Sequence, residues 1–354
     1  MANRYDHLDE DDIRVRPSRR GSRPRSKQRP AHEDATPGRV IAVDRGRYQV
    51  LVGSEQSAGS PESDVIVTAV KSRNLGRKGI VVGDSVGLVG DVSGEKDTMA
   101  RIVRQHPRTS VLRRTADDTD PVERVIVANA DQLVIVTALA NPEPRPRMID
   151  RCLVAAYDAG LTPILLLTKA DLVSADDLLS LYGDLDVEVL VTQITDDAAA
   201  GLDEVRAVLS DKVSVFVGHS GVGKSTLVNA LVPDAYRATG HVNDVTGRGR
   251  HTSTSAVALR LPNDRGWVVD TPGVRSFGLA HVDLDKIIDH FPELAEGTEQ
   301  CPRACSHDEP DCGLDDFVAE SAAEQPHLAH RLESLRRLLR SRSSEDETGR
   351  GGQP

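Results

Sequence analysis

The stretch that decides the fold is GHSGVGKST, residues 218–226. A β-branched run, residues 213–217, comes directly before it, and an apolar helical run, residues 227–231, follows it. Strand, glycine-rich loop and helix in this order are typical of the phosphate-binding loop. The glycines let successive backbone N–H groups face phosphate oxygens, and the helix N-terminus adds partial positive charge. The stretch therefore predicts a nucleoside triphosphate site in an α/β domain.

Two side chains of this loop have separate roles. Lys224 reaches the β- and γ-phosphates, where it also opposes charge that develops during phosphoryl transfer, and the Ser225 hydroxyl binds Mg²⁺. We therefore predict that Lys224 is catalytic as well as nucleotide-binding. The nucleotide-binding residues predicted from the whole loop are Gly218, Gly221, Val222, Gly223, Lys224, Ser225 and Thr226.

A second phosphate motif, DTPG, occupies residues 270–273, directly after the apolar run 267–269. In phosphate-loop proteins an Asp at this place holds the hydration shell of Mg²⁺, and the N–H of the Gly contacts the γ-phosphate. Alone, the tetrapeptide would indicate only a turn. Its place after a strand and behind the phosphate loop makes Asp270 and Gly273 predicted nucleotide-site residues.

The residues TKAD, 168–171, end another apolar run and resemble the guanine-recognition motif Asn-Lys-x-Asp. The Asp171 carboxylate accepts both N–H groups on the guanine edge, whereas adenine offers no such pair and would leave the acid unpaired. Lys169 lays its alkyl stem along the ring. Thr168 replaces the usual Asn and alters one hydrogen bond to the base. A phosphate-loop ATPase or kinase is the alternative that Thr168 favours and Asp171 opposes.

Strands and helices alternate around these motifs. We expect strands at 133–137, 163–168, 187–191 and 213–217, and helices at 148–159, 175–182 and 202–209. Such alternation predicts a mainly parallel sheet with helices on both faces. The guanine motif precedes the phosphate loop, whereas in ordinary small GTPases it follows, so the motif order is circularly permuted.

The chain before this domain contains short β-branched runs at 40–43, 48–52, 65–70, 80–82, 86–89 and 102–103. Several short strands within one small region predict a β-barrel, with the oligonucleotide-binding (OB) fold as the leading candidate. Lys71, Arg73, Arg77 and Lys78 surround one loop, which is either a nucleic-acid surface or a solvated loop.

The residues Cys301, Cys305, His307 and Cys312 supply three thiolates and one imidazole, enough to close a tetrahedral Zn²⁺ site. We predict one zinc ion per chain. The surrounding sequence has few apolar residues and could hardly fold without the metal. A redox role is the alternative, but it leaves the histidine unused. Beyond this cluster, residues 327–342 have leucines at helical spacing, which we expect to pack, and flanking arginines that face either RNA or solvent.

The full set of motifs resembles one family. It comprises the permuted order, ANADQ at 128–132, GRGRHTST at 247–254 and the Cys/His cluster. Together, over about residues 38–340, these features are similar to the small-ribosomal-subunit-dependent GTPases (RsgA, also called YjeQ). The resemblance implies a barrel, a permuted GTPase and a zinc module that bind the small subunit late in its maturation, with GTP hydrolysis stimulated by that subunit. The alternative is an RNA-binding module in which GTP fixes the conformation and hydrolysis is negligible.

The segment between the two phosphate motifs is rich in Gly, Arg and Asn at residues 240–251, which is typical of a loop ordered by nucleotide or partner. Either Thr252 or Thr254 is expected to join Ser225 on Mg²⁺. Val274 stands where many GTPases carry a Gln that orients the attacking water. His251 matches the histidine of the family's switch motif and is our candidate for that role; the alternative is a histidine that contacts only RNA or solvent.

Length and charge set the remaining expectations. The chain has 354 residues and a net charge of −11, yet residues 14–29 hold eight basic residues and no acid, which suits either a polyanion-binding arm or a solvated tail. No apolar run approaches the ~20 residues of a membrane span, and the N-terminus lacks a signal peptide. We expect a cytoplasmic monomer whose partners are GTP or GDP and the small ribosomal subunit with its rRNA. Cys152 is expected to be plain core.

These patterns predict a multidomain chain. The expected divisions are a disordered basic tail at 1–37, an OB-fold-like barrel at 38–106, a linker at 107–122, a circularly permuted α/β GTPase domain at 123–290, a zinc-binding module with a C-terminal helix at 291–342 and a disordered tail at 343–354.

Overall fold

A computed structural model describes residues 32–53, 64–76, 79–115, 123–195, 199–233, 256–262, 266–271, 279, 282 and 286–342. The expectations for residues 1–31 and 343–354, for Arg77 and Lys78, and for the segment 240–255 lie outside this described part. Within it, no helix combines the length and the apolar character that crossing a membrane requires.

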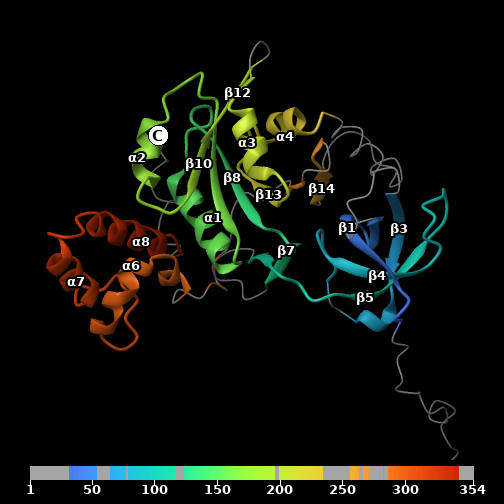
Figure 1. The fold of residues 1–354 in the computed structure, drawn as a ribbon, viewed down its shortest axis with the longest axis horizontal. Helices are drawn as coiled ribbons and strands as arrows, with labels where there is room; N and C mark the ends of the chain where they lie inside the picture. The colour runs from blue at the N-terminus through green and yellow to red at the C-terminus, as the bar shows by residue number, and fades with distance from the viewer. Residues whose placement is uncertain are drawn as a thin grey trace, which may run out of the picture. The chain divides into compact units, whose positions relative to one another are not determined.

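Five strands of the N-terminal region form a closed barrel (Figure 1). They are β1 (Thr36–Asp44), β2 (Arg47–Val52), β3 (Val65–Lys71), β4 (Ser85–Gly90) and β5 (Ala100–Gln105), with the short helix η3 (Arg73–Leu75) after β3. The order is β1-β2-β3-β5-β4, and β4 pairs back with β1. Val40, Val50, Val67 and Ile102 are fully buried in its core. The predicted OB-like barrel is confirmed, although the run 80–82 forms only an isolated bridge from Val82 to Val127.

A buried carboxylate joins the barrel to the chain that leaves it. Asp84 is fully buried and accepts hydrogen bonds from the backbone N–H of Val81 at 2.8 Å and from Gln105 Nε2 at 3.0 Å. Arg108 donates to both oxygens of Asp84, at 2.7 Å from Nε and 2.8 Å from a terminal nitrogen. Because the charge is paired and fully hydrogen-bonded, its burial is tolerated.

The stretch expected to be a linker contains a strand. Strand β6 (Val111–Arg114) forms an antiparallel hairpin with β7 (Arg124–Ala128). The apolar Leu112 is 1% exposed, so its burial against β7 outweighs the polar character of its neighbours. Asn129 follows the hairpin; its side chain donates to the Gly83 carbonyl and accepts from the Thr109 N–H, both at 2.8 Å.

The GTPase motifs lie on six strands in the order β10-β9-β8-β13-β15-β14. Their bounds are β8 (Gln132–Ala138), β9 (Thr162–Thr168), β10 (Glu188–Val191), β13 (Val213–Val217), β14 (Val257–Arg260) and β15 (Trp267–Asp270), and a small separate hairpin pairs β11 (Gln193–Ile194) with β12 (Ala199–Ala200). Every neighbouring pair is parallel except β14 with β15. The permuted order of the motifs is therefore compatible with a mainly parallel sheet in which neighbouring strands pair without interruption, as predicted.

Side chains that alternate along these strands divide into two layers. On one face Leu133 and Leu165 share a cluster with Leu153 of helix α1 (Pro146–Asp158). On the other face Val134 and Ile164 pack with helices α3 (Leu202–Leu209) and α4 (Lys224–Leu231). Helix α2 (Asp176–Tyr182) adds Leu178 and Tyr182 to the first layer. Both faces of the parallel sheet are thus covered, which is why its strands are almost continuously apolar.

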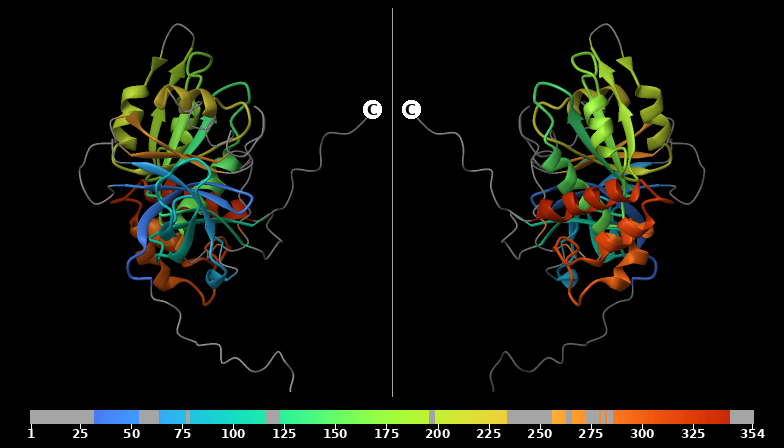
Figure 2. Two further views of the ribbon diagram at one scale, coloured as in Figure 1. Left: turned by 90° about the vertical axis from the view of Figure 1, so that its right-hand side faces the viewer. Right: turned by 90° about the vertical axis from the view of Figure 1, so that its left-hand side faces the viewer.

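Helices make up the C-terminal module, drawn in orange and red in Figure 2. They are η6 (Ile288–His290), α6 (Pro292–Ala295), η7 (Glu296–Gln300), α7 (Gly313–Ser321) and α8 (Leu328–Arg342). The expected helix at 327–342 is α8, and its predicted core leucines are buried, with Leu335 and Leu338 fully so.

Four arginines of α8, Arg331, Arg336, Arg337 and Arg340, are bonded to protein, and Arg340 is also exposed to solvent; contact with RNA stays a prediction. Arg331 pairs with Glu293 and donates to the Asp184 carbonyl at 2.6 Å, while Arg340 pairs with Asp308 at 2.6 Å. Arg337 approaches the buried Asp150 of α1 at 3.3 Å. Burial raises the pKa of Asp150, and the neighbouring Arg337 opposes that shift. The contacts with Asp184 and Asp150 thus hold α8 against the end of α2 and against α1.

We predict that Asp84→Ala destabilises the protein by about 3 kcal/mol, because it removes the fully buried acceptor that the Val81 N–H, Gln105 and the partly buried Arg108 share. The free energy of unfolding, measured by urea titration, checks this. The control is Asp91→Ala, whose exposed carboxylate accepts hydrogen bonds from the backbone and side chain of Ser93, two residues further on. Equal losses of unfolding free energy in the two variants would show that the hydrogen bonds of Asp84 stabilise the fold no more than those of an exposed aspartate.

Candidate functional site

The phosphate loop follows β13 and ends where α4 begins at Lys224. Gly221 and Gly223 have φ values of +86° and +89°, a region that side chains other than glycine rarely adopt. At Gly218 a side chain would meet the Val136 carbonyl oxygen at 2.6 Å, so only glycine lets the loop pass this close to β8. The sequence pattern and the backbone conformation therefore agree at all three glycines.

Asp270 and Lys224 form an ion pair, which brings the second phosphate motif to the first. Asp270 ends β15 and lies opposite Phe216 of β13 in the parallel ladder. The buried hydroxyl of Thr271 donates to the Phe216 carbonyl at 2.7 Å and so holds the end of β15 against β13. The predicted Lys224 and Asp270 thus meet at the carboxyl edge of the sheet, where parallel α/β folds bind their ligands.

Thr168 links the guanine motif to the phosphate loop. Its side chain is 5% exposed, and its hydroxyl donates to the Val222 carbonyl at 2.6 Å. This contact positions Thr168 against the phosphate loop, and its predicted place at the guanine base stays a prediction. An Asn side chain could donate the same hydrogen bond to this loop carbonyl, so the threonine retains one function of the usual asparagine.

The rest of the guanine motif lies beside a loop that sequence reasoning missed. Lys169 has a φ of +60° and donates through Nζ to the Asn141 carbonyl, and Asp171 is exposed. In the same loop Arg145 lies 3.2 Å from Nε2 of His219 in the phosphate loop. Two prolines within residues 141–145 are typical of a loop, but they give no sign of its neighbours in space.

The predicted zinc ligands converge. The four ligand atoms of Cys301, Cys305, His307 and Cys312 all lie within 4.8 Å of one another. Cys301 Sγ is 3.9 Å from Cys312 Sγ and 3.6 Å from Nδ1 of His307. Two thiolates on one tetrahedral Zn²⁺ are about 3.8 Å apart, given Zn–S bonds of about 2.3 Å. The donor set and its spacing therefore fit a structural zinc ion.

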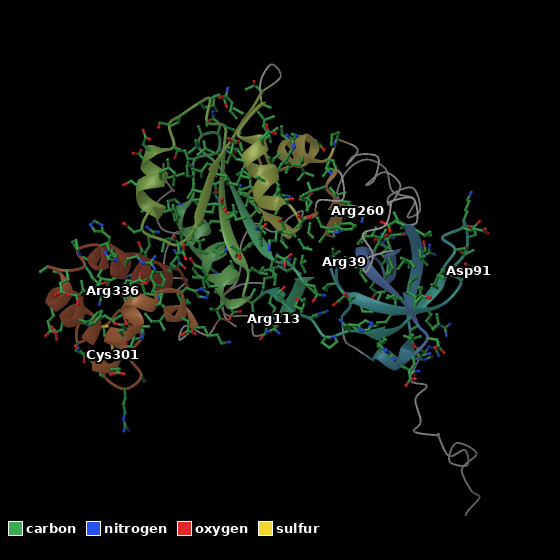
Figure 3. All side chains as sticks on the ribbon, in the orientation of Figure 1. Arg39, Asp91, Arg113, Arg260, Cys301 and Arg336 are labelled. Atoms are coloured by element: carbon green, nitrogen blue, oxygen red, sulfur yellow. The ribbon has the colours of Figure 1, made fainter. Side chains whose placement is uncertain are left out.

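A second layer of contacts holds these ligands. Arg336 of α8 donates to the His307 carbonyl at 3.0 Å and to both oxygens of Asp315, at 2.7 and 2.8 Å. Cys301 and Arg336 are both labelled in the C-terminal module in Figure 3. Glu309 accepts from the Ser306 N–H, and this bond lowers the pKa of Glu309 to about 2. Such outer contacts orient the ligating residues.

Several predicted site residues lie outside the described part of the chain. They are His251, Thr252, Thr254 and Gly273. Their assignments to water orientation, to Mg²⁺ and to the γ-phosphate stay predictions, as does the contact of Ser225 with Mg²⁺. Cys152, by contrast, is 1% exposed within the sheet core, and burial raises the pKa of its thiol to about 12, as suits a packing residue.

Comparison with known proteins identifies the family. The sequence model of the RsgA GTPase matches residues 105–280. The small ribosomal subunit biogenesis GTPase RsgA of Pseudomonas aeruginosa is 40% identical over 253 residues, which are 69% of this chain and 72% of that protein. The chain belongs to the RsgA GTPase family. It is accordingly a hydrolase acting on GTP.

Further relatives agree with this assignment. RsgA of Pseudomonas putida is 40% identical over 248 residues, covering 68% of this chain and 69% of its own length. The crystal structure of YjeQ from Thermotoga maritima aligns with a TM-score of 0.58 and 25% identity over 85% of this chain and 98% of that one. The circularly permuted GTPase YloQ aligns with a TM-score of 0.56 and 24% identity, over 87% and 98%. The permuted fold is therefore confirmed.

We predict that Thr168→Val weakens GTP binding about tenfold, because it leaves the Val222 carbonyl without its hydrogen bond, a loss of about 1–1.5 kcal/mol. Calorimetric titration with GTP measures the effect. Thr162→Val serves as the matched control, since Thr162 is exposed at the other end of the same strand. Unchanged affinity in Thr168→Val would mean that this bond does not shape the phosphate loop.

We predict one Zn²⁺ per chain, lost in Cys312→Ser together with the helical signal of the C-terminal module. The module has too small a core to persist without its metal, whereas GTP binds to separate elements and should bind as before. Metal analysis and calorimetry check the two halves. Cys152→Ser, which alters the one thiol outside the cluster, should keep its zinc. Zinc-free parent protein that retains its full helical signal would contradict the prediction.

Proposed function

We propose that this protein hydrolyses GTP during late maturation of the small ribosomal subunit, binding the subunit and its rRNA and turning over faster on it. The observation that carries the proposal is the meeting of three motifs at one sheet edge. Lys224 pairs with Asp270, and Thr168 bonds to Val222. The RsgA relatives, named as small ribosomal subunit biogenesis GTPases, supply the partner.

Residues of this chain take the following parts in the proposal. Lys169 and Asp171 select guanine, and the phosphate loop binds the phosphates. Ser225 and Asp270 hold Mg²⁺ directly or through water, with Thr252 or Thr254 completing the set. Mg²⁺ screens the phosphate charge when it is bound. When GTP binds, Lys224 has to leave Asp270 and pair with the phosphates. Without nucleotide, the Asp270 carboxylate therefore neutralises the charge of Lys224, as the phosphates would.

The barrel and the zinc module complete the proposed assembly. An OB-like barrel with exposed Arg73 and Arg101 offers a surface for rRNA. Because the α8 arginines are bonded to protein, we assign the module an anchoring role and place less of the RNA contact there. We propose a monomer that acts in the cytoplasm, where small subunits mature, with the domain boundaries given above.

The test is GTP turnover titrated with purified small subunits. We expect stimulation in the parent chain, competition by unlabelled GTP and none by equal ATP, and a roughly 100-fold lower stimulated rate in His251→Ala, the usual scale for a lost positioning or general-base group. Binding of the variant to subunits should be nearly intact.

Each contrary result has a distinct meaning. Turnover that ignores small subunits contradicts a subunit-dependent GTPase and favours an RNA-binding module with GTP as a conformational ligand. A His251→Ala loss seen only in subunit binding assigns that residue to RNA contact. Competition by ATP contradicts guanine recognition by Asp171.

A further inference from the structure

Strand β14 connects the GTPase strands to the barrel strands within one continuous sheet. It pairs antiparallel with β15 of the GTPase sheet and also meets β1 of the barrel, where Ala42 lies opposite Val257. The segment that precedes β14 carries the predicted switch residues, and β15, which follows it, ends in Asp270. A strand of four residues therefore separates the barrel from the phosphate motifs.

The register places this contact on the line of Asp270. Val257, the partner of Ala42, is itself opposite Asp270, and Asp270 is opposite Phe216, which lies just before the phosphate loop. Ala42 and Asp270 are thus two strand spacings apart, about 10 Å. Apolar packing also connects the barrel to the sheet one register position away, since Ile41 of β1 joins Ala258 and Val269 in one buried cluster.

An ion pair fastens the other end of β14. Arg260, labelled in Figure 3, pairs with Asp64, the residue before β3 in the barrel. Asp64 is 12% exposed and Arg260 35% exposed, so the pair is partly shielded from water. The Arg260 guanidinium also lies over the ring of Trp267, 5.4 Å from its centroid. Trp267 begins β15 and is directly opposite Arg260.

The barrel backbone leaves room for this pair at one glycine. A side chain at Gly53 would lie 2.0 Å from Oδ1 of Asp64 and 3.0 Å from its Cα. Any residue larger than glycine must therefore displace the Asp64 carboxylate. Gly53→Ala offers a way to disturb the pair without removing a charge.

We propose that Asp64 and Arg260 are positioning residues that couple the barrel to Asp270 through β14. A ligand bound to the barrel then shifts the position of β14, which connects the switch segment to Asp270, and so changes the affinity for nucleotide. By linkage, the nucleotide changes the affinity of the barrel for that ligand by the same factor. The identity of that ligand as the small subunit rests on the proposed function. The coupling itself does not.

The single tryptophan makes the coupling measurable without any subunit. The chain contains one Trp, and Trp267 lies under Arg260. In the full-length parent we expect Trp267 fluorescence to differ between GDP and a non-hydrolysable GTP analogue. Asp64→Ala and Gly53→Ala should each reduce that difference by at least half; the charge-swapped pair Asp64→Arg with Arg260→Asp also removes the guanidinium from the indole, so it is tested by turnover instead. Asp203→Ala, which breaks the exposed pair with Arg206 on α3, is the control and should leave the difference unchanged.

Turnover with small subunits gives the second readout. The ratio of stimulated to basal GTP hydrolysis should fall about tenfold in Asp64→Ala and recover in the swapped pair, which a merely structural loss would not do. A fluorescence difference absent from the parent, or retained in full by Asp64→Ala with GTP affinity intact, overturns the proposal. A parent that shows the fluorescence difference but no stimulation contradicts the proposed function alone.

Discussion

The parallel pairing of β13 between β8 and β15 is the constraint on which the site depends. Because the phosphate loop leaves the end of β13, every group that serves it must come from the same edge of the sheet. Register then decides which residues arrive. Phe216 opposite Asp270 brings the acid to Lys224, and the β8 and β9 ladder brings Thr168 to Val222. Circular permutation changes the order of these strands along the chain but leaves their pairing in the sheet unchanged.

Much of this arrangement could be predicted, because its determinants are local. The glycines of the phosphate loop, the apolar runs of the parallel strands and the zinc ligands from Cys301 to Cys312 each lie within a short stretch. Period and spacing therefore suffice to find them. Residue type also identified Asp171 and Asp270 as candidates, since a strand precedes each of them.

The missed features all depend on partners that are distant in sequence. Strands β6 and β14 have four residues each, and only their neighbours in space decide that they pair. The ion pair of Arg337 could not be predicted, because its partner Asp150 lies far away in the sequence, in α1, and neither segment contains a pattern that indicates the other. The same holds for the bond from the Thr168 hydroxyl to the Val222 carbonyl, because the two residues lie far apart in the sequence.

The burial of Cys152 has a consequence for the chemistry of the whole chain. Of its four cysteines, Cys152 lies in the sheet core with a thiol pKa of about 12, and the other three belong to the metal cluster. An alkylating reagent needs an accessible thiolate, so the folded protein offers it only the cluster. The predicted Zn²⁺ would shield those sulfurs when it is bound, and its loss would expose them together. Labelling of three thiols on a molecule whose core stays folded would therefore indicate an empty zinc centre, and labelling of none would indicate a filled one.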